Sequence, residues 1–295
     1  MEKTKSNPKT RLAKPAWLKR RLPVGGDYEA VRTLLEKQGL HSVCQEARCP
    51  NIWECYARKT ATFLVMGPAC TRNCRFCAVE QGPKGPPDPA EAERVADAVK
   101  ALGLRYVVIT SVTRDDLPDG GAAHFARTIE TTRKRNPGIC VEVLIPDFQG
   151  DAHALGTVLD TSPDVLNHNL ETVARLYPRV RPEADYGRSL ELLRRSQSHA
   201  PGIPTKSGLM LGLGETAEEI REALNDLRRA GCEMLTLGQY LQPSRDHLEV
   251  SRFVPPEAFD AWRKEALDMG FSGAAGGPFV RSSYHAREHY EAMGR

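Results

Sequence analysis

Three closely spaced cysteines constrain this chain more than any other feature. Cys70, Cys74 and Cys77 follow the pattern C-x3-C-x2-C, directly after the apolar run 61–67. Thiolates that converge from one loop can hold an iron–sulfur cluster, but a four-iron cluster needs one ligand for each iron. The fourth iron would then be open to a small molecule, as the open position of a catalytic metal site is. A zinc site or a structural iron–sulfur site is the alternative interpretation.

A second group of three cysteines precedes the first. Cys44, Cys49 and Cys55 follow the pattern C-x4-C-x5-C in a segment with little periodicity of either kind. Neither spacing places all three on one face of a regular helix, so we expect a folded-back loop to bring them together. These three cysteines are soft ligands, and a fourth ligand is again missing. A zinc site that His41 completes is the alternative interpretation.

The composition is that of an ordinary soluble globular protein. The 295 residues are 40% hydrophobic and 27% charged, and no apolar run approaches the roughly 20 residues that span a bilayer. The basic N-terminus lacks the apolar segment of a secretory signal, so a cytoplasmic location is predicted. Clustered cysteines in that reducing compartment more often bind metal than form disulfides. Cys140 and Cys232 lie in apolar runs and are expected in the core.

Positive charge is concentrated at the N-terminus. Residues 1–22 carry eight Lys or Arg and one acid, a net charge of +7, whereas the remainder carries −4. Such a tail could attract an acidic partner or could be a solvated terminus. A nucleic-acid-binding module with two structural zinc sites is one hypothesis, but the chain lacks the basic stripe and interleaved aromatic residues of such surfaces. No nucleic-acid partner and no membrane association are therefore predicted.

From residue 61 onward, short β-branched runs alternate six times with amphipathic helical stretches. Strands are predicted at 61–67, 105–112, 139–146, 164–170, 204–212 and 233–241, and helices at 27–38 and near 89–101, 121–135, 151–159, 185–197, 216–230 and 257–269. The alternation predicts parallel strands joined by helices, either in a doubly wound sheet or in a partial barrel. Polar residues gather at the C-terminal ends of the strands, which favours a partial (β/α)6 TIM-type barrel of the α/β class.

Four helix boundaries are marked by particular residues. Asp27 and Asp88 are predicted N-caps, and Gly39 is a predicted C-terminal stop. Thr216 and Glu219 have the spacing of a capping box.

In this order the motifs resemble those of the lipoyl synthase family of radical S-adenosylmethionine enzymes. The resemblance rests on both cysteine triads, on T-S-V-T-R-D-D-L at 110–117, on N-H-N-L-E at 167–171 and on R-S-S-Y at 281–284. It extends from about residue 27 to residue 284. The first triad alone is typical of radical enzymes in general, whereas the pair of triads is typical of this family.

The resemblance implies a radical sulfurtransferase that inserts sulfur at C6 and C8 of a protein-bound octanoyl-lysine. Alkyl C–H groups are not acidic, so a side-chain base cannot remove these hydrogens and a cofactor must supply the chemistry. The implied cofactors are two 4Fe-4S clusters and S-adenosylmethionine. Two molecules of S-adenosylmethionine are used for the insertion of the two sulfur atoms. The triad at 70–77 would hold the reducing cluster, and the triad at 44–55 an auxiliary cluster that is consumed as the sulfur source.

The resemblance also implies roles for individual residues. Ser283 would be the fourth protein ligand of the auxiliary cluster, with Ser282 as the alternative. Asn169 and Glu171 would face the ribose of S-adenosylmethionine. Three basic residues are candidates for contacts with the cofactor carboxylate or the substrate, or alternatively for structural ion pairs: Arg114, Lys206 and Arg281.

The implied organisation has three parts. Residues 1–57 form an N-terminal extension with the auxiliary cysteines, residues 58–270 the radical S-adenosylmethionine barrel, and residues 271–295 a C-terminal extension. The two extensions are expected to close the barrel against water and oxygen.

The implied partners are proteins that carry the substrate, electrons or iron. They are octanoylated lipoyl carrier domains, namely E2 subunits of 2-oxoacid dehydrogenases and the glycine cleavage H protein, an electron donor and an iron–sulfur carrier protein. A radical enzyme that acts on another small molecule is the remaining alternative, because motifs do not identify the substrate.

Overall fold

The computed structural model describes residues 12–19, 27–82 and 85–294. Most of the basic N-terminal tail therefore lies outside the described residues. A 3-10 helix, η1 (Ala16–Leu18), is the one element of the first described range.

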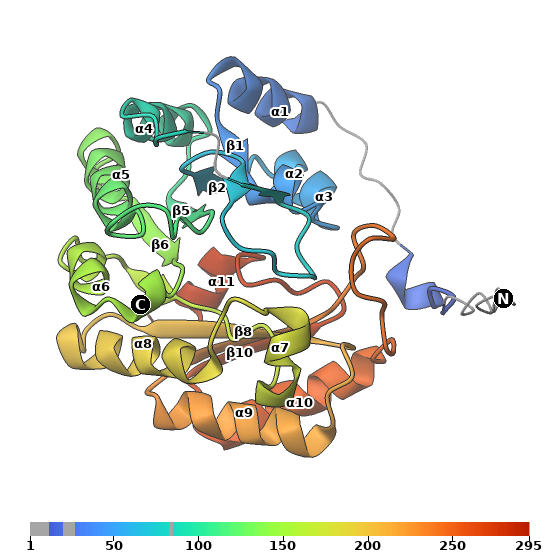
Figure 1. The fold of residues 1–295 in the computed structure, drawn as a ribbon. Coiled ribbons are helices and arrows are strands. Elements are labelled where there is room, and N and C mark those ends of the chain that lie inside the picture. Colours follow the sequence, from blue (N-terminus) through green and yellow to red (C-terminus); the bar gives the residue numbers. More distant parts are fainter. Residues whose placement is uncertain (1–11, 20–26, 83–84, 295) are drawn as a thin grey trace, which may run out of the picture.

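In the described residues, eight strands form one sheet at the centre of the molecule (Figure 1). In spatial order they are β1 (His41–Ser42), β2 (Thr62–Val65), β5 (Tyr106–Ser111), β6 (Cys140–Leu144), β7 (Val165–Asn167), β8 (Thr205–Leu211), β9 (Met234–Gln239) and β10 (Gly273–Gly277). All neighbours are parallel except β1 and β2. The sheet order follows the chain order, as in a barrel built from repeated βα units. The six predicted strands are confirmed.

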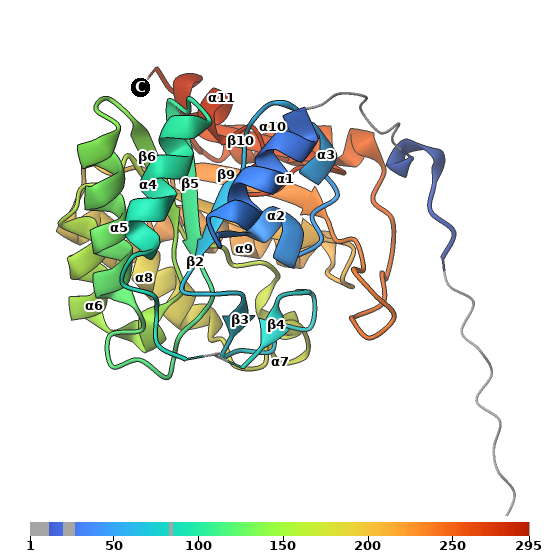
Figure 2. The same ribbon diagram turned by 90° about the horizontal axis from the view of Figure 1, so that it is seen from above.

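Helices surround the sheet (Figures 1 and 2). Those of the βα repeat are α4 (Glu91–Ala101), α5 (Ala122–Arg135), α6 (Ala152–Leu159), α8 (Tyr186–His199), α9 (Ala217–Arg229) and α10 (Pro256–Asp268). The N-terminal segment adds α1 (Asp27–Lys37), α2 (Val43–Glu46) and α3 (Ile52–Ala57). Shorter elements are η2 (Phe148–Gly150), η3 (Ala174–Leu176), α7 (Tyr177–Val180) and α11 (Ala286–Glu291). Each predicted helix is present.

The boundary residues behave partly as predicted. Thr216 and Glu219 form the capping box of α9, and Gly39 follows α1 with φ +59°. The N-cap prediction for Asp88 is wrong: the N-cap of α4 is Ala90, because Asp88 closes a separate turn by accepting from the Ala90 backbone N–H at 2.9 Å. Asp27 is the first residue of α1 rather than the residue before it.

The C-terminal segment contributes a strand to the central sheet. Gly273–Gly277 joins the sheet as β10, parallel to β9, so seven strands of this sheet run parallel instead of the predicted six. This run has no β-branched residue and carries no strand signal in the sequence. Close packing explains its composition, since a Cβ atom on Gly276 would lie 2.7 Å from the Phe259 carbonyl oxygen of α10.

The two terminal segments meet each other. Asn51 Nδ2 donates to the Phe279 carbonyl oxygen at 2.7 Å, and Tyr284 Oη donates to Glu54 Oε1 at 2.8 Å. The N-terminal segment therefore lies against the C-terminal segment across about 230 residues of sequence.

The barrel interior contains a buried ion pair. Lys206 Nζ lies 3.0 Å from Glu142 Oε1, and neither side chain is exposed to solvent. Tyr106 and Asn167 also donate to the Glu142 carboxylate, at 2.6 and 3.2 Å. The carboxylate therefore has one cationic and two neutral donors, which compensates for its removal from water.

We predict that Lys206→Met destabilises the fold, because the Glu142 carboxylate would remain buried without a cation. The free energy of unfolding should fall by about 3 kcal/mol, measured by urea denaturation of the cluster-free protein. Lys264→Met is the matched control, because Lys264 pairs with Asp268 on the exposed side of α10 and its loss should change stability little. Equal effects of the two substitutions would contradict the prediction.

Candidate active site

The first cysteine triad lies in a loop at the C-terminal end of β2. This loop begins with β3 (Ala69–Cys70), which pairs in parallel with β4 (Glu80–Gln81). The pKa of the Cys77 thiol is raised to about 12, mainly by burial, and the neighbouring Cys74 and Cys70 contribute to this increase. The three thiols are therefore close enough to influence one another, as the sequence predicts.

Backbone N–H groups are directed at the first thiol of this triad. Cys70 Sγ lies 3.4 Å from the backbone N of Arg72 and 3.3 Å from that of Thr113. Hydrogen bonds to ligand sulfur tune the potential of iron–sulfur clusters. Cys70 is thus presented with its sulfur already hydrogen-bonded.

The side chain of Arg72 fastens the cysteine loop to the barrel. Its guanidinium donates to both oxygens of Asp115, at 2.6 and 2.9 Å, and to Asp147 Oδ1 at 2.6 Å. Arg72 is 7% exposed, and its hydrogen bonds hold the pKa of Asp147 at about 2, against the opposing effect of burial. Asp115 follows β5 and Asp147 follows β6, so the fork ties the loop to the ends of two strands.

Two other segments hold the same loop. The backbone N of Asn73 donates to Glu183 Oε2 at 2.5 Å, and that of Arg75 donates to the Val180 carbonyl oxygen at 3.0 Å. His247 Nε2 lies 2.9 Å from the Cys77 carbonyl oxygen and must donate its proton, because a carbonyl only accepts. Glu183 and His247 are anchors that carry no motif signal in the sequence.

The predicted nucleoside-facing residues lie together beyond β7. Asn169 Nδ2 donates to Glu171 Oε1 at 2.9 Å, and Asn169 Oδ1 is buried without a partner among the described residues. Glu171 has φ +67°, in the left-handed region that non-glycine residues seldom adopt and that clusters at functional sites. Burial raises the pKa of the Glu171 carboxyl, and the positive charge of Arg181 opposes this effect.

Arg181 connects these residues to the cysteine loop. Its Nη1 donates to the carbonyl oxygens of Asn169 and Leu170, at 2.9 and 3.2 Å. Its charge also opposes the increase in the pKa of Cys74 that burial causes. Arg181 therefore lies between the cysteine loop and the segment after β7, a position that the sequence does not reveal.

The three basic candidates differ in their surroundings. Arg114 donates to both oxygens of Asp116, at 2.8 and 2.7 Å. Lys206, the second residue of β8, pairs with Glu142 as described above. Burial raises the pKa of the Glu171 carboxyl, and the positive charge of Arg281 partly opposes this increase. The structure thus brings Arg281 near Asn169 and Glu171, and gives Arg114 and Lys206 ion-pair partners; their roles toward a ligand stay predictions.

The second triad lies on two short helices instead of one folded-back loop. Cys44 is in α2 and Cys55 in α3, with Cys49 in the turn between them. Burial raises the pKa of Cys44, and the neighbouring Cys49 and Cys55 add to this effect, so the three thiols are close together. His41 Nδ1 lies 3.0 Å from Glu46 Oε1.

We define residues 278–285 as the C-terminal strap, which contains the predicted ligand Ser283. Asn51 and Glu54, which hold the strap at Phe279 and Tyr284, flank the cysteines of the second triad. Ser282 Oγ accepts from Asn169 Nδ2 at 3.3 Å. The neighbouring Ser283 therefore lies on a segment fixed against the auxiliary cysteines.

The donor set fits two iron–sulfur clusters. Each site offers three thiols, and the first also offers N–H groups to sulfur and a buried unpartnered acceptor, Asn169 Oδ1. Within the described ranges, no three His, Cys, Asp or Glu side chains are placed to ligate one metal ion. In a cluster each thiolate binds a different iron, so the ligands need not meet at one point.

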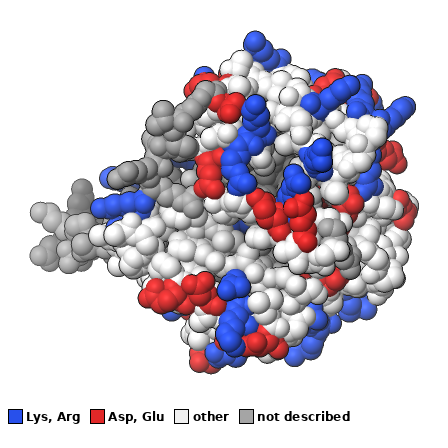
Figure 3. All heavy atoms as spheres, turned by 180° about the vertical axis from the view of Figure 1, so that it is seen from behind, with Lys and Arg blue, Asp and Glu red and all other residues white. Residues whose placement is uncertain are grey.

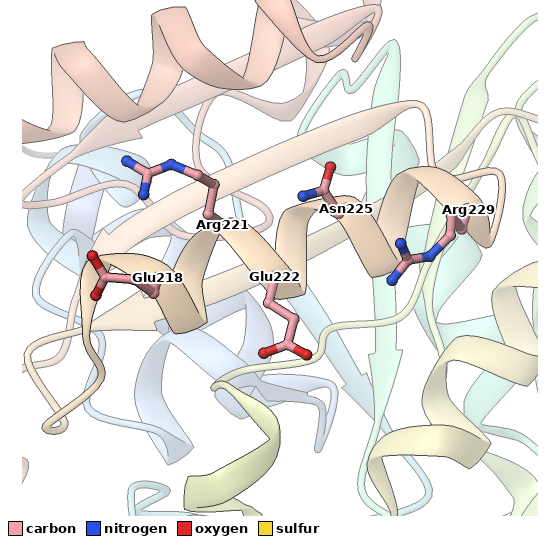
Figure 4. Close-up of a pocket in the computed structure, with 5 residues that line it drawn as sticks. All are labelled: Glu218, Arg221, Glu222, Asn225 and Arg229. Carbon is pink, nitrogen blue, oxygen red and sulfur yellow. The ribbon is translucent and has the colours of Figure 1, made fainter.

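Two hollows lie outside the cysteine sites. One, of about 400 Å³, is on the outer face of α9 and is lined by Glu218, Arg221, Glu222, Asn225 and Arg229 (Figure 4). Arg221 pairs there with Glu265 at 2.5 Å, as on a solvated helix face. The other, of about 530 Å³, lies beyond β5 and β6 and includes Asp115, the partner of Arg72.

On the face shown in Figure 3, basic and acidic side chains are interspersed in small groups. Among the described helices, none has both the length and the apolar character needed to cross a membrane.

Comparisons with known proteins give one family. The radical SAM superfamily model matches residues 64–227, and the model of the N-terminal domain of lipoyl synthase matches residues 1–49. The lipoyl synthase of Desulfotalea psychrophila is 60% identical over 96% of this chain and 94% of the relative. That of Methylococcus capsulatus is 57% identical over 99% of this chain and 91% of the relative.

Solved structures share the fold. HydG, a maturase of a hydrogenase, has a TM-score of 0.60 at 16% identity, over 91% of this chain and 71% of that one. The coproporphyrinogen III oxidase HemN from Escherichia coli has a TM-score of 0.51 at 16% identity, over 76% and 57%. These likenesses confirm the partial barrel.

We predict a pH dependence of stability from His168. Burial, and then the charge of Arg181, lower the pKa of this imidazole to about 4, below the unfolded value of about 6.5. The stability provided by the neutral ring is therefore present above pH 6.5 and is lost as the pH falls toward 4. Between pH 7 and pH 5 the loss should be about 2 kcal/mol.

The measurement is urea unfolding of cluster-free protein at both pH values. His168→Gln removes the titrating ring, so the variant should lose less stability over the same interval. A variant with the same pH slope as the wild type would contradict the assignment.

Proposed function

The chain belongs to the lipoyl synthase family of the radical SAM superfamily, and from this premise we propose that it inserts sulfur at C6 and C8 of a protein-bound octanoyl-lysine. The observation that carries the proposal is the connection of the two thiol triads through one strap. The triad at 70–77 alone is compatible with many radical enzymes. The second triad, held against Phe279 and Tyr284, is the part specific to sulfur insertion.

When bound, the two 4Fe-4S clusters and two molecules of S-adenosylmethionine would supply reducing power, hydrogen abstraction and sulfur. Cys70, Cys74 and Cys77 would hold three irons of the reducing cluster and leave one for the cofactor. The backbone N–H groups of Arg72 and Thr113 would donate hydrogen bonds to the Cys70 sulfur as a cluster ligand. The Arg72 fork keeps the loop that would hold this cluster at the ends of β5 and β6.

Asn169 and Glu171 would orient the nucleoside. The unpartnered Asn169 Oδ1 can accept from a ribose hydroxyl, and the Glu171 carboxylate can accept from another. Arg181 fixes the backbone that carries both residues through its bonds to two carbonyl oxygens. Arg281, whose charge opposes the increase in the pKa of Glu171, would be a candidate for contact with an anionic group of the cofactor or substrate.

Cys44, Cys49, Cys55 and Ser283 would hold the auxiliary cluster. Serine oxygen is a hard ligand and a poor match for iron–sulfur chemistry, so it can leave more easily than a fourth thiolate. This property suits a cluster that gives up sulfur. Ser282 is the less suitable ligand, because its hydroxyl is bonded to Asn169.

The three-part organisation follows from these roles. Residues 1–57 would be an N-terminal extension that supplies the auxiliary cysteines, residues 58–270 the barrel, and residues 271–295 a C-terminal extension that includes β10 and the strap. The proposed protein substrates are octanoylated lipoyl carrier domains, of E2 subunits or of the glycine cleavage H protein. An electron donor and an iron–sulfur carrier complete the set of partners, and the reducing cytoplasm is the proposed location.

The first test is composition and turnover. Protein reconstituted with iron and sulfide under anaerobic conditions should hold about eight irons per chain, four for each cluster. It should convert an octanoyl-lysine carrier to the lipoyl form, followed by mass spectrometry. Zinc in place of iron would overturn the proposal. Cleavage of S-adenosylmethionine without action on octanoylated carriers would favour a radical enzyme with another substrate.

A second prediction concerns Ser283. Ser283→Ala should keep the reducing cluster and S-adenosylmethionine binding but lose lipoyl formation by at least about tenfold, because the auxiliary cluster lacks its oxygen ligand. Ser198→Ala is the matched control, since that hydroxyl bonds only the Arg194 carbonyl oxygen on the outer side of α8. Full activity of Ser283→Ala would show that Ser282 or another residue is the fourth ligand.

A further inference from the structure

One hydrogen bond joins the strap to the segment after β7. Asn169 Nδ2 donates to Ser282 Oγ and to Glu171 Oε1, at 3.3 and 2.9 Å. Asn169 is 8% exposed, and its Oδ1 has no partner in the part of the chain that the structure describes. The protein therefore uses the donor side of this amide, and the acceptor side remains available to a ligand.

The strap is held on both sides of Ser282. The Phe279 carbonyl oxygen accepts from Asn51, and Tyr284 donates to Glu54. Asn51 and Glu54 belong to the segment that carries the auxiliary cysteines. Ser282 therefore connects two regions: its strap is anchored to the segment with the auxiliary cysteines, and its own hydroxyl accepts from Asn169 beyond β7.

The strap also lies tightly against β9. A Cβ atom on Gly238 would be 2.1 Å from the Val280 carbonyl oxygen and 3.0 Å from Arg281 Nη1. At this position there is no room for even a methyl group between the strap and the strand. The packing therefore restricts the strap directly before Ser282, and Ser283 is the next residue along the chain.

We propose that Ser282 is a positioning residue that couples S-adenosylmethionine binding at Asn169 to the placement of Ser283 at the auxiliary cluster. The inference rests on the proposed function, which assigns Asn169 and Ser283. A nucleoside hydroxyl bonded to Asn169 Oδ1 fixes the orientation of the amide. The Nδ2 group then holds the Ser282 hydroxyl, and Ser283 is kept against the auxiliary cysteines.

Coupling between two sites is reciprocal. If the nucleoside stabilises the placement of Ser283, an intact auxiliary cluster must strengthen S-adenosylmethionine binding by the same factor. This consequence can be measured by binding alone, without turnover.

The experiment is a double-mutant cycle on full-length reconstituted protein. S-adenosylmethionine dissociation constants are measured by anaerobic equilibrium dialysis for the wild type, for Ser282→Ala, for a variant with the three auxiliary cysteines changed to alanine, and for the combination. Loss of the auxiliary cluster should weaken binding about fivefold or more when Ser282 is present. In the Ser282→Ala background, the dissociation constants measured without and with the auxiliary cluster should be nearly equal, so that their ratio is close to one.

Matched variants separate the hydroxyl from the shape of the side chain. Ser282→Thr keeps a hydroxyl and should retain the coupling, whereas Ser282→Val has the same shape without it and should lose the coupling. If Ser282→Ala does not fold, the coupling is tested by comparing Ser282→Thr with Ser282→Val. Ser198→Ala should behave as the wild type.

A spectroscopic readout tests the same point. In the wild type, addition of S-adenosylmethionine should change the Mössbauer spectrum of the auxiliary cluster, and in Ser282→Ala it should not. An unchanged binding ratio in Ser282→Ala would overturn the proposal. So would a fall from about eight to about four irons in this variant, which would make Ser282 itself the ligand.

Octanoyl conversion by the wild type is assayed in parallel. If the wild type does not convert the carrier, the proposed function fails, whatever the binding ratios are. If it does and Ser282→Ala keeps the wild-type ratio, only the coupling fails.

Discussion

The fork between Arg72 and the two carboxylates of Asp115 and Asp147 is the interaction on which the site depends. An eight-residue loop with three cysteines has no periodic secondary structure to fix it, so its shape must come from contacts with the rigid barrel. The buried guanidinium provides these contacts to the ends of β5 and β6 at once. A lysine at this position could not reproduce the bidentate geometry, because its ammonium is a single point of charge.

The second constraint is that residues from both ends of the chain must meet over the barrel. The contacts from Asn51 and Glu54 to the strap join segments about 230 residues apart. They hold the C-terminal strap against the segment that carries the auxiliary cysteines, and radical chemistry at such a site requires water and oxygen to be excluded. The antiparallel β1 at one edge of the sheet and the glycine-rich β10 at the other extend the partial barrel toward these segments.

Much of this arrangement is predictable from the sequence, because repeated patterns carry it. The six alternations of β-branched runs and amphipathic helices define the parallel sheet, and Thr216 with Glu219 marks a helix start that the structure reproduces. The two triads and the N-H-N-L-E stretch predict which residues gather at the rim.

What could not be predicted depends on pairs that are distant in sequence. Nothing in the sequence joins Lys206 to Glu142, or places Arg181 between Cys74 and Asn169. The sequence does not predict β10 for another reason. Its composition follows from close packing, as at Gly276 against the Phe259 carbonyl oxygen, and not from strand propensity. The contact between Ser282 and Asn169 spans 113 residues and involves two common polar side chains.

The strap also sets an order of events during synthesis. Its anchors, Phe279 and Tyr284, are translated more than 200 residues after Asn51 and Glu54, the residues to which they bond. These two contacts can therefore form only after almost the whole chain has been made, and a chain that ends before Phe279 would lack both of them.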